Sequence, residues 1–433
     1  MKSKPKGSSE LSASLDRARE FTDSGQVLQA EMLYLALLKE WPECAEASVN
    51  VARFAMHRGD APRAAKLLES AYCANPQIPQ IGVDLGLAYF TSALFDRAKQ
   101  TLEETVSRAP DHPPAWLLLG EVRDAMGDRI GATRARYQAM TRAQAVGLWT
   151  SQNTTAPELL QAVLDGVEKH RIHRREILFA CLDALVHECG RQDLVRVERA
   201  LTCYLGESAA VPPDSRQQPK FFYFPDLPNM PYHDPFLQPW AARLQSAWTG
   251  IRDEAVALLH DDRQFRSFLD FVPGTPSDAY VGGSGPRPAW DAFFFYRHGE
   301  RFDANHAQCP FTSDVLEELA LCRVKAKAPE VCFSVLRPGS KIMPHYGVTN
   351  TRLVMHLPLV VPADCALNVL GDEPQYWREG ELLMFDDTFQ HEAWNNSNHS
   401  RVILLMDCWN PHLTQPEQRA VKQLVETIDL LEN

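Results

Sequence analysis

The chain has 433 residues, of which 45% are hydrophobic and 23% charged, and its formal net charge at pH 7 is -12. This length exceeds one ordinary core and predicts about two to four structural units. The acidic excess argues against a nucleic-acid partner held by phosphate neutralisation, and the absence of a long apolar run predicts no membrane span.

Residues 1–10 are basic and polar and lack the apolar segment of a signal peptide, so we expect a short disordered tail there. The chain contains 10 cysteines, scattered without a C-x-x-C pair. This spacing argues against a cysteine zinc site and favours reduced thiols in a cytoplasmic protein.

A period of 34 residues marks the segment 11–144. The recurring residues are Ala30, Ala64, Ala98 and Ala132; Gly25, Gly59 and Gly127, with Ala93 filling the gap; and Pro42, Pro76 and Pro110. A small residue suits the crossing of two helices, a glycine suits the end of the first helix, and a proline suits the end of the second. The pattern resembles tetratricopeptide repeats and predicts an α-helical array.

Arrays of this kind bind a peptide or protein, or serve as self-association surfaces or spacers. The residues leave these alternatives open. Residues 145–212 keep helical apolar spacing but lose the period, so we expect them to form a helical connector.

The amino-acid composition changes at 206–220, where proline, serine and polar residues cluster as in a linker. Beyond it we expect a helix around 236–260, then short alternating runs divided by turns, then a helix over 415–431. Antiparallel strands at this spacing predict a double-stranded β-helix, or jelly roll, over residues 213–433. The whole chain is therefore expected to be a multidomain α + β protein.

One expected strand, 351–361, carries charged side chains. Because side chains alternate along a strand, Arg352, Val354 and His356 share one face, and apolar residues share the other. Further along the chain, His391 and Arg401 are 10 residues apart, and we expect a hairpin to bring them together.

A jelly roll with His345 after an early strand, His391 before a late one and an arginine beyond it resembles the iron(II)- and 2-oxoglutarate-dependent dioxygenases. Iron(II) suits imidazole ligands with positions left open for a bidentate keto acid and O2. The far carboxylate of the keto acid suits the planar fork of an arginine in an apolar pocket.

The usual His-x-Asp/Glu pattern of those enzymes is missing, because Tyr346 and Gly347 follow His345. This departure, with the words SVLRPGS, PHYGVTNTRL, FDDTFQHEAWN and RVILLMDCWNP, is similar to the aspartyl/asparaginyl β-hydroxylase family, whose iron is held by two histidines without the acid. The resemblance covers roughly 218–412. In that family tetratricopeptide-like helices can precede the catalytic domain.

The resemblance implies roles for six residues. The metal falls on His345 and His391, the keto acid on Ser334, His356 and Arg401, and the substrate carboxylate on Arg352. Two contacts of the animal enzyme have no counterpart, since Val354 replaces a second cosubstrate arginine and Ala292 replaces a substrate-reading glutamine. Its disulfide is also missing, because Phe302 stands where the partner of Cys309 would be.

The third metal ligand stays open. Asp386 and Asp387 lie in a turn at the end of an expected strand, where carboxylates usually cap the backbone or orient a neighbouring ligand such as His391. We expect those roles for them in preference to metal ligation.

The resemblance implies an Fe(II)/2-oxoglutarate-dependent dioxygenase that hydroxylates an unactivated carbon. The expected substrate is an aspartyl or asparaginyl residue of a peptide or protein recruited by the repeats. One alternative is a hydroxylase of another small molecule or of a lipid. The other is a non-catalytic scaffold with a degenerate jelly roll, which Val354 favours and the intact His345, His391 and Arg401 oppose.

Overall fold

The computed structural model describes residues 6–269, 280–285 and 289–433. The chain divides into two units: one runs to Ile177 and also takes Ile428–Asn433, and the other is Leu178–Thr427. The connector expected over 145–212 is therefore split between the two units. The tail expected over 1–10 lies partly outside the described residues, and its remaining part forms the start of the first helix.

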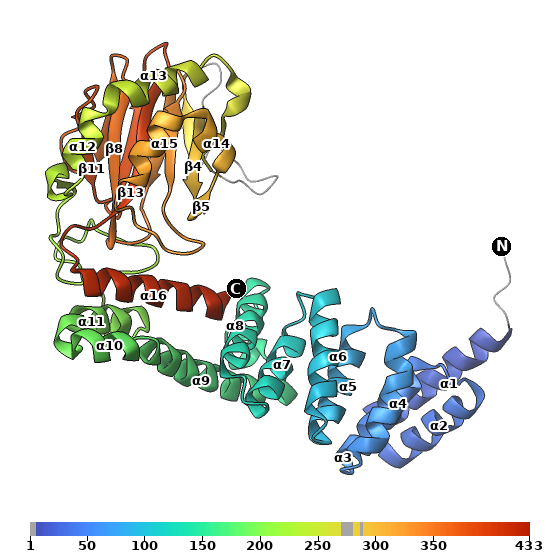
Figure 1. Cartoon of the computed structure of the whole chain (residues 1–433). Coiled ribbons are helices and arrows are strands. Elements are labelled where there is room, and N and C mark those ends of the chain that lie inside the picture. The colour runs from blue at the N-terminus through green and yellow to red at the C-terminus, as the bar shows by residue number, and fades with distance from the viewer. Residues whose placement is uncertain (1–5, 270–279, 286–288) are drawn as a thin grey trace. The chain divides into compact units, whose positions relative to one another are not determined.

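Eight helices form the array of the first unit (Figure 1). They are α1 (Lys6–Asp23), α2 (Val27–Glu40), α3 (Ala45–His57), α4 (Ala61–Ala74), α5 (Pro79–Thr91), α6 (Phe95–Arg108), α7 (Pro113–Ala125) and α8 (Arg129–Ala145). The periodic residues Ala30, Ala64, Ala98 and Ala132 are fully buried, which confirms the need for a small residue there. The chain enters the left-handed region at Gly25, Gly59 and Gly127, and also at Ala93.

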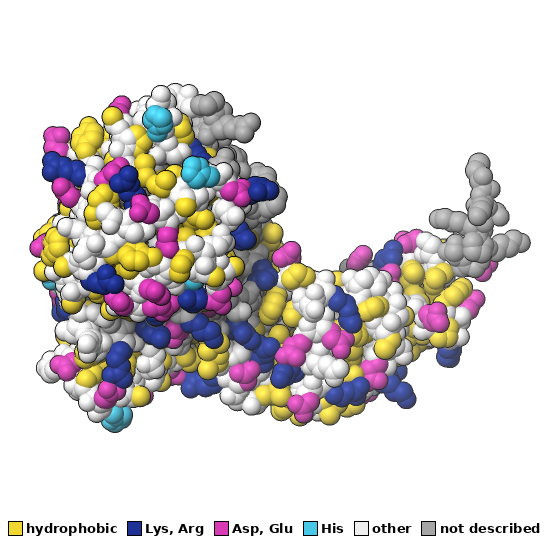
Figure 2. Space-filling view, turned by 45° about the horizontal axis from the view of Figure 1, so that its top comes forward, with side chains coloured by type: hydrophobic (Ala, Val, Ile, Leu, Met, Phe, Trp, Pro, Cys, Tyr) yellow, Lys and Arg dark blue, Asp and Glu magenta, His cyan; other side chains and the backbone are white. Residues whose placement is uncertain are grey.

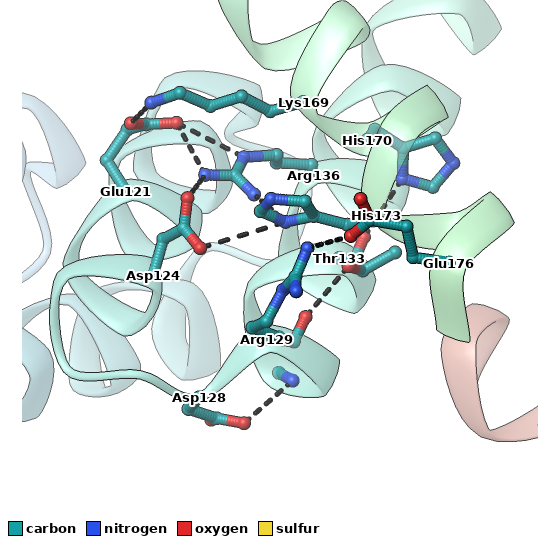
Figure 3. A network of polar contacts seen from close by, with 11 residues as sticks. Glu121, Asp124, Asp128, Arg129, Thr133, Arg136, Lys169, His170, His173 and Glu176 are labelled. Carbon is teal, nitrogen blue, oxygen red and sulfur yellow. Dashed lines mark hydrogen bonds and ion pairs between the residues drawn. The ribbon is translucent and has the colours of Figure 1, made fainter. Parts of the chain in front are cut away.

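A network of ion pairs ties α7 and α8 to the long helix α9 (Pro157–Ala180) (Figure 3). The fully buried Arg136 pairs with Glu121 at 2.8 Å and with Asp124 at 2.7 Å. Lys169 also reaches Glu121, and the Nδ1 of His170 lies 3.1 Å from the carbonyl oxygen of Thr133. The basic side chains Lys169 and His170 of α9 therefore take part in the packing within this unit.

Two antiparallel sheets form the second unit. The larger has the order β1-β11-β8-β13-β6-β4-β2, with β5 paired to β4, and the smaller has the order β10-β9-β12-β7-β3. The strands are β1 (Tyr232–His233), β2 (Arg266–Ser267), β3 (Val281–Gly283), β4 (Trp290–Arg297), β5 (Glu300–Arg301), β6 (Val331–Leu336), β7 (Ser340–His345), β8 (Arg352–Val360), β9 (Cys365–Val369), β10 (Gln375–Tyr376), β11 (Leu383–Phe385), β12 (His391–Asn395) and β13 (Arg401–Trp409). This arrangement confirms the expected jelly roll.

Helices cover the outer face of the larger sheet (Figure 1). They are α12 (Ala241–Ser246), α13 (Trp248–Leu258), α14 (Asp303–Gln308) and α15 (Pro310–Glu317). The helix expected over 236–260 is thus two helices, which meet at Ala247. Three further helices of the chain are α10 (Asp183–Cys189), α11 (Val195–Tyr204) and α16 (Gln415–Glu432).

The alternation expected for β8 is confirmed. Leu353, Met355 and Leu357 pack in the core under the helices, whereas Val354 packs between the two sheets. The expected hairpin between His391 and Arg401 is wrong, because β12 belongs to the smaller sheet and β13 to the larger. The link between them crosses from one sheet to the other, so that both residues reach the space between the sheets.

All ten cysteines are free, as the scattered spacing indicates. Five in the second unit are buried: Cys309, Cys322, Cys332, Cys365 and Cys408. Burial raises the pKa of Cys365 to about 11 and that of Cys309 to about 12. These thiols are therefore protonated and shielded at neutral pH.

Figure 2 shows acidic and basic side chains interspersed over the face in view, with hydrophobic side chains between them. No helix within the described part of the chain is long and apolar enough to cross a lipid bilayer.

Candidate active site

Two histidines face each other across neighbouring strands of the smaller sheet. His345 ends β7, His391 begins β12, and the two are directly paired in the ladder. Their ring centroids are 4.1 Å apart. Each Nδ1 lies 2.9 Å from a carbonyl oxygen two residues earlier, that of Met343 or that of Phe389. Since a backbone carbonyl only accepts, each Nδ1 donates its proton and each Nε2 keeps a free lone pair.

Burial keeps both imidazoles neutral. It lowers the pKa of His345 and lowers that of His391 to about 3, where the neighbouring His345 adds to the effect. A metal ligand must be the neutral imidazole. The pair therefore fits a divalent transition metal such as iron(II), which accepts two nitrogen donors and keeps other positions open.

A cavity of ≈ 180 Å³ lies between the two sheets beside these histidines. The larger sheet contributes Ser334 from β6, His356 from β8 and Arg401 from β13 to its wall. Residues predicted from the motif words as metal and keto-acid contacts thus line one space, although 57 residues separate Ser334 from His391 in the sequence.

Arg401 is the least compensated charge in this cavity. It is 1% exposed, and its Nη1 lies 3.3 Å from the carbonyl oxygen and 3.4 Å from the Oγ of Ser334. Its Nε has no hydrogen-bond partner, and no carboxylate of the described residues forms an ion pair with it. Burial lowers the pKa of Arg401 to about 10, so the group is still charged at neutral pH. A buried cation in this state needs an anion to compensate it.

Two indoles hold the polar residues around Arg401. Trp290 Nε1 donates to Ser334 Oγ at 2.9 Å, and Trp377 Nε1 donates to His356 Nδ1 at 3.2 Å. His356 therefore carries its proton on Nε2, and the hydroxyl proton of Ser334 is available for an acceptor. The Arg401 guanidinium also lies over the Trp377 ring, 4.8 Å from its centroid.

The sequence gives little sign of these supporting indoles. Trp377 lies beyond β10, outside every motif word, and its role becomes visible only when the chain folds back onto β8. The contact of Trp290 with Ser334 depends on the pairing of β4 with β6.

Arg352 is not a free cation. It forms an ion pair with Asp407, which is buried beside it on β13. Burial alone would lower the pKa of Arg352, but Asp407 reverses this and holds it above its ordinary value. Glu330 and Asp387 line the same cavity. The arginine predicted to face a substrate carboxylate is thus already compensated by a buried acid on the neighbouring strand.

The two aspartates before His391 have different surroundings. Asp386 caps its turn, because Oδ1 accepts from the backbone nitrogen of Thr388 at 2.9 Å and Oδ2 accepts from Gln217 at 2.7 Å. Asp387 lies against Gly347, where an added Cβ would stand 2.1 Å from its carboxylate. Its carboxylate therefore takes the space that a side chain two residues after His345 would need. Among the residues placed by the structure, no group of three or more His, Cys, Asp or Glu side chains could hold a metal.

A double-sheet fold whose interior brings two facing histidines beside an uncompensated arginine defines the class of 2-oxoglutarate oxygenase domains. The family model described as aspartyl/asparaginyl beta-hydroxylase matches residues 245–411. Two tetratricopeptide repeat models match residues 15–79 and 55–122. The chain therefore carries a C-terminal domain of the aspartyl/asparaginyl β-hydroxylase family of 2-oxoglutarate oxygenases, preceded by tetratricopeptide repeats.

Three relatives illustrate the range of this family. The chain is 32% identical to aspartate beta-hydroxylase domain-containing protein 2 of Xenopus tropicalis over 213 residues, which are 48% of this chain and 55% of that protein. It is 33% identical to human aspartyl/asparaginyl beta-hydroxylase over 181 residues, 41% of this chain and 22% of that protein. It is 29% identical to the ornithine lipid ester-linked acyl 2-hydroxylase of Rhizobium tropici over 187 residues, 43% of this chain and 62% of that protein. The chain thus spans about half the length of the first of these relatives.

Proposed function

We propose that this chain is an iron(II)- and 2-oxoglutarate-dependent dioxygenase that hydroxylates an unactivated carbon. The observation that carries the proposal is the buried, uncompensated Arg401 in the same cavity as the neutral pair His345 and His391. A dianionic keto acid would neutralise the arginine at one end and meet a metal at the other. A retired scaffold would have no reason to keep this charge buried, because an unpaired cation destabilises a core.

In this proposal the Nε2 atoms of His345 and His391 hold the metal. Bound iron(II) would activate O2 for insertion into a C–H bond, with the keto acid leaving as succinate and carbon dioxide. Arg401 and Ser334 hold the far carboxylate of the keto acid through charge-assisted hydrogen bonds. His356 donates from Nε2 to the near carboxylate, because Val354 lines this cavity in place of a longer basic side chain.

The substrate proposed first is an aspartyl or asparaginyl side chain in a peptide or protein, hydroxylated at its β-carbon. The support is membership of the family, and the repeat array would recruit or position such a partner. A lipid substrate is the second candidate, because one relative is named as an acyl hydroxylase. We also propose a cytoplasmic setting, since the ten free cysteines suit a reducing compartment.

The test is succinate formation from 2-oxoglutarate by the full chain with iron(II) and ascorbate under air. We expect the parent protein to release succinate even without its true substrate, and we expect His391→Ala to abolish the release. His399→Ala is the matched control, because His399 lies on the exposed link between the sheets. If the parent makes no succinate and does not bind 2-oxoglutarate in calorimetry, the scaffold function replaces the oxygenase.

A further inference from the structure

One segment of the second unit lies against both loops that carry the histidines of the proposed metal site. It comprises residues 217–224, which we call the clasp. One of the two loops, 346–350, directly follows His345, and the other, 386–390, directly precedes His391. A segment in contact with both loops can set how the two histidines lie relative to each other.

The backbone of the clasp holds the loop after His345. The backbone nitrogen of Lys220 donates to the carbonyl oxygen of Gly347 at 3.1 Å, and that of Phe221 donates to the carbonyl oxygen of Val348 at 2.9 Å. Both acceptors lie within three residues of His345. The backbone just beyond this histidine therefore cannot shift without breaking these hydrogen bonds.

The side chain of Gln217 holds the loop before His391. Gln217 is 3% exposed, and its Nε2 donates to Asp386 Oδ2 at 2.7 Å. The other carboxylate oxygen of Asp386 accepts from the backbone nitrogen of Thr388 at 2.9 Å, so this carboxylate connects Gln217 to the turn. The next residue of the turn is Phe389, whose carbonyl oxygen accepts from His391 Nδ1.

The Phe389 carbonyl fixes both the tautomer of His391 and the angle of its ring. A main-chain group of this kind is positioned by the turn that carries it, and Asp386 and Gln217 hold that turn. Within the described ranges, no group of three or more His, Cys, Asp or Glu side chains could hold a metal. Because the protein then offers a pair of imidazoles, the affinity for a metal depends on how well both are oriented before it binds.

We propose that Gln217 is a positioning residue for the metal site: by holding Asp386 it keeps His391 oriented opposite His345 and so raises the affinity for a divalent transition metal. This inference rests on the proposed oxygenase function, and it concerns a residue outside the segment that the family model matches. The other end of the Gln217 amide is also held, because its Oε1 accepts from Asn229 Nδ2 at 2.5 Å. The orientation of the amide, with its donor toward Asp386, is therefore determined.

The test is the binding of cobalt(II), an air-stable substitute for iron(II), to the full chain without 2-oxoglutarate. Calorimetry and the visible absorption of the bound ion measure the affinity. Gln217→Met keeps the length of the side chain but removes both of its hydrogen bonds, so cobalt(II) should bind about tenfold more weakly. Gln218→Met is the matched control and should bind as the parent does, because the exposed Gln218 side chain donates to the carbonyl oxygen of Ser215.

A rescue separates this hydrogen bond from a general loss of packing. Asp386→Asn places an amide donor against the Gln217 amide and should also weaken cobalt(II) binding about tenfold. The double variant Gln217→Glu/Asp386→Asn exchanges donor and acceptor, so the new asparagine amide can donate to the new carboxylate. Its affinity should return to within about threefold of the parent. Hydrogen exchange of the metal-free proteins shows whether each variant keeps the fold of the second unit, and the Asp386→Asn pair of variants decides if Gln217→Met does not fold.

Parent-like cobalt(II) affinity in a folded Gln217→Met, or a double variant that binds no better than Asp386→Asn, would overturn the inference. Succinate release by the iron-loaded parent is measured separately. If the parent makes succinate and the variants bind cobalt(II) as it does, the role of Gln217 fails alone. If the affinities change as expected but the parent makes no succinate, the oxygenase function fails and Gln217 still positions a metal site. A parent that binds no cobalt(II) would overturn the inference and the metal site together.

Discussion

The charge of Arg401 determines how its removal should act. A side chain that only stabilises a core destabilises the protein when it is replaced, whereas a buried cation without a counter-ion can be replaced by an apolar group of similar length at little cost. Arg401→Met should therefore leave the unfolding free energy of the ligand-free protein within about 1 kcal/mol of the parent. It should weaken 2-oxoglutarate binding by roughly 100-fold, since charge-assisted hydrogen bonds are lost.

Calorimetry with 2-oxoglutarate and a thermal melt of the ligand-free protein check both parts. Arg419→Met, at an exposed ion pair with Glu188, serves as the control for loss of an arginine. A large loss of stability with unchanged affinity would mean that Arg401 is structural.

Trp377 should act through His356. Trp377→Phe keeps an aromatic ring under Arg401 but removes the N–H that donates to His356 Nδ1. The imidazole proton can then move to Nδ1, which removes the donor that faces the keto acid, so 2-oxoglutarate should bind about fivefold more weakly. Trp248→Phe on α13, outside the cavity lining, should leave the binding constant unchanged. An unchanged constant in Trp377→Phe would show that His356 is held by its packing alone.

At the scale of elements, the array follows its sequence closely because every repeat needs the same small residue and the same turn. The exception is Ala93, which adopts φ 57° where the other repeats have glycine. Ala93 is exposed, so Ala93→Gly removes strain without removing a contact. We expect slower amide hydrogen exchange in α5 and α6, equivalent to about 0.5–1 kcal/mol of stabilisation.

Ala109→Gly provides the opposite case. Ala109 ends α6 with φ −131°, which any residue adopts, so glycine there only adds freedom to the unfolded chain. Faster exchange in this variant and slower exchange in Ala93→Gly are expected together. Faster exchange in both would mean that Ala93 is not strained.

The network of α7, α8 and α9 predicts a pH dependence (Figure 3). Burial lowers the pKa of His170 from 6.5 to about 4. Above pH 6.5 the imidazole is neutral in both the folded and the unfolded chain, and it adds nothing to the pH dependence. Between pH 6.5 and 4 the unfolded chain takes up the proton first, so the unit should lose stability as the pH falls, by about 3 kcal/mol in all.

Hydrogen exchange of α8 and α9 at a series of pH values measures this loss. His170→Gln should reduce the slope but leave a smaller one, because burial also lowers the pKa values of His173 and His112. His57→Gln, at the exposed end of α3, should keep the slope of the parent. A parent profile that is flat between pH 6.5 and 4 would mean that folding does not lower the pKa of His170.

The strands that carry His345 and His391 are the elements that sequence patterns miss. β4, β6, β8 and β13 stand out because they alternate or are buried on both faces, but β7 and β12 read as turns with polar residues. The pairing of β7 with β12 places His391 opposite His345. This pairing forms only within the smaller sheet, which joins segments far apart in the sequence. The sequence motifs name residues that the structure brings to one cavity, whereas the strands that carry the histidines and the contacts of Trp377 and Asp407 could not be predicted from those motifs.

At the scale of the whole molecule, the 34-residue repeat predicts a helical array, and the change of composition after residue 206 predicts a jelly roll. The division of the chain at Ile177 and again before Ile428 was not predictable. A helical connector carries no repeat that would mark where one unit ends, and α16 is one uninterrupted amphipathic helix in the sequence. Boundaries of this kind depend on long-range contacts that no local pattern records.

The buried thiols of the second unit can report how often this unit opens. Cys332 and Cys408 lie on β6 and β13, at the centre of the larger sheet, where an alkylating reagent reaches them only if the sheet opens. Their labelling rate in native buffer therefore reports how often this unit opens, while the exposed Cys73 of the array reacts at once and serves as the reference. Because a ligand stabilises only the state that binds it, 2-oxoglutarate with a metal should slow the labelling of Cys332 and Cys408 and leave that of Cys73 unchanged. Because the thiols are reduced, each opening of the hydroxylase domain lets a reagent alkylate them. Mass spectrometry of the intact chain then measures the opening rate from the number of alkyl groups added over time.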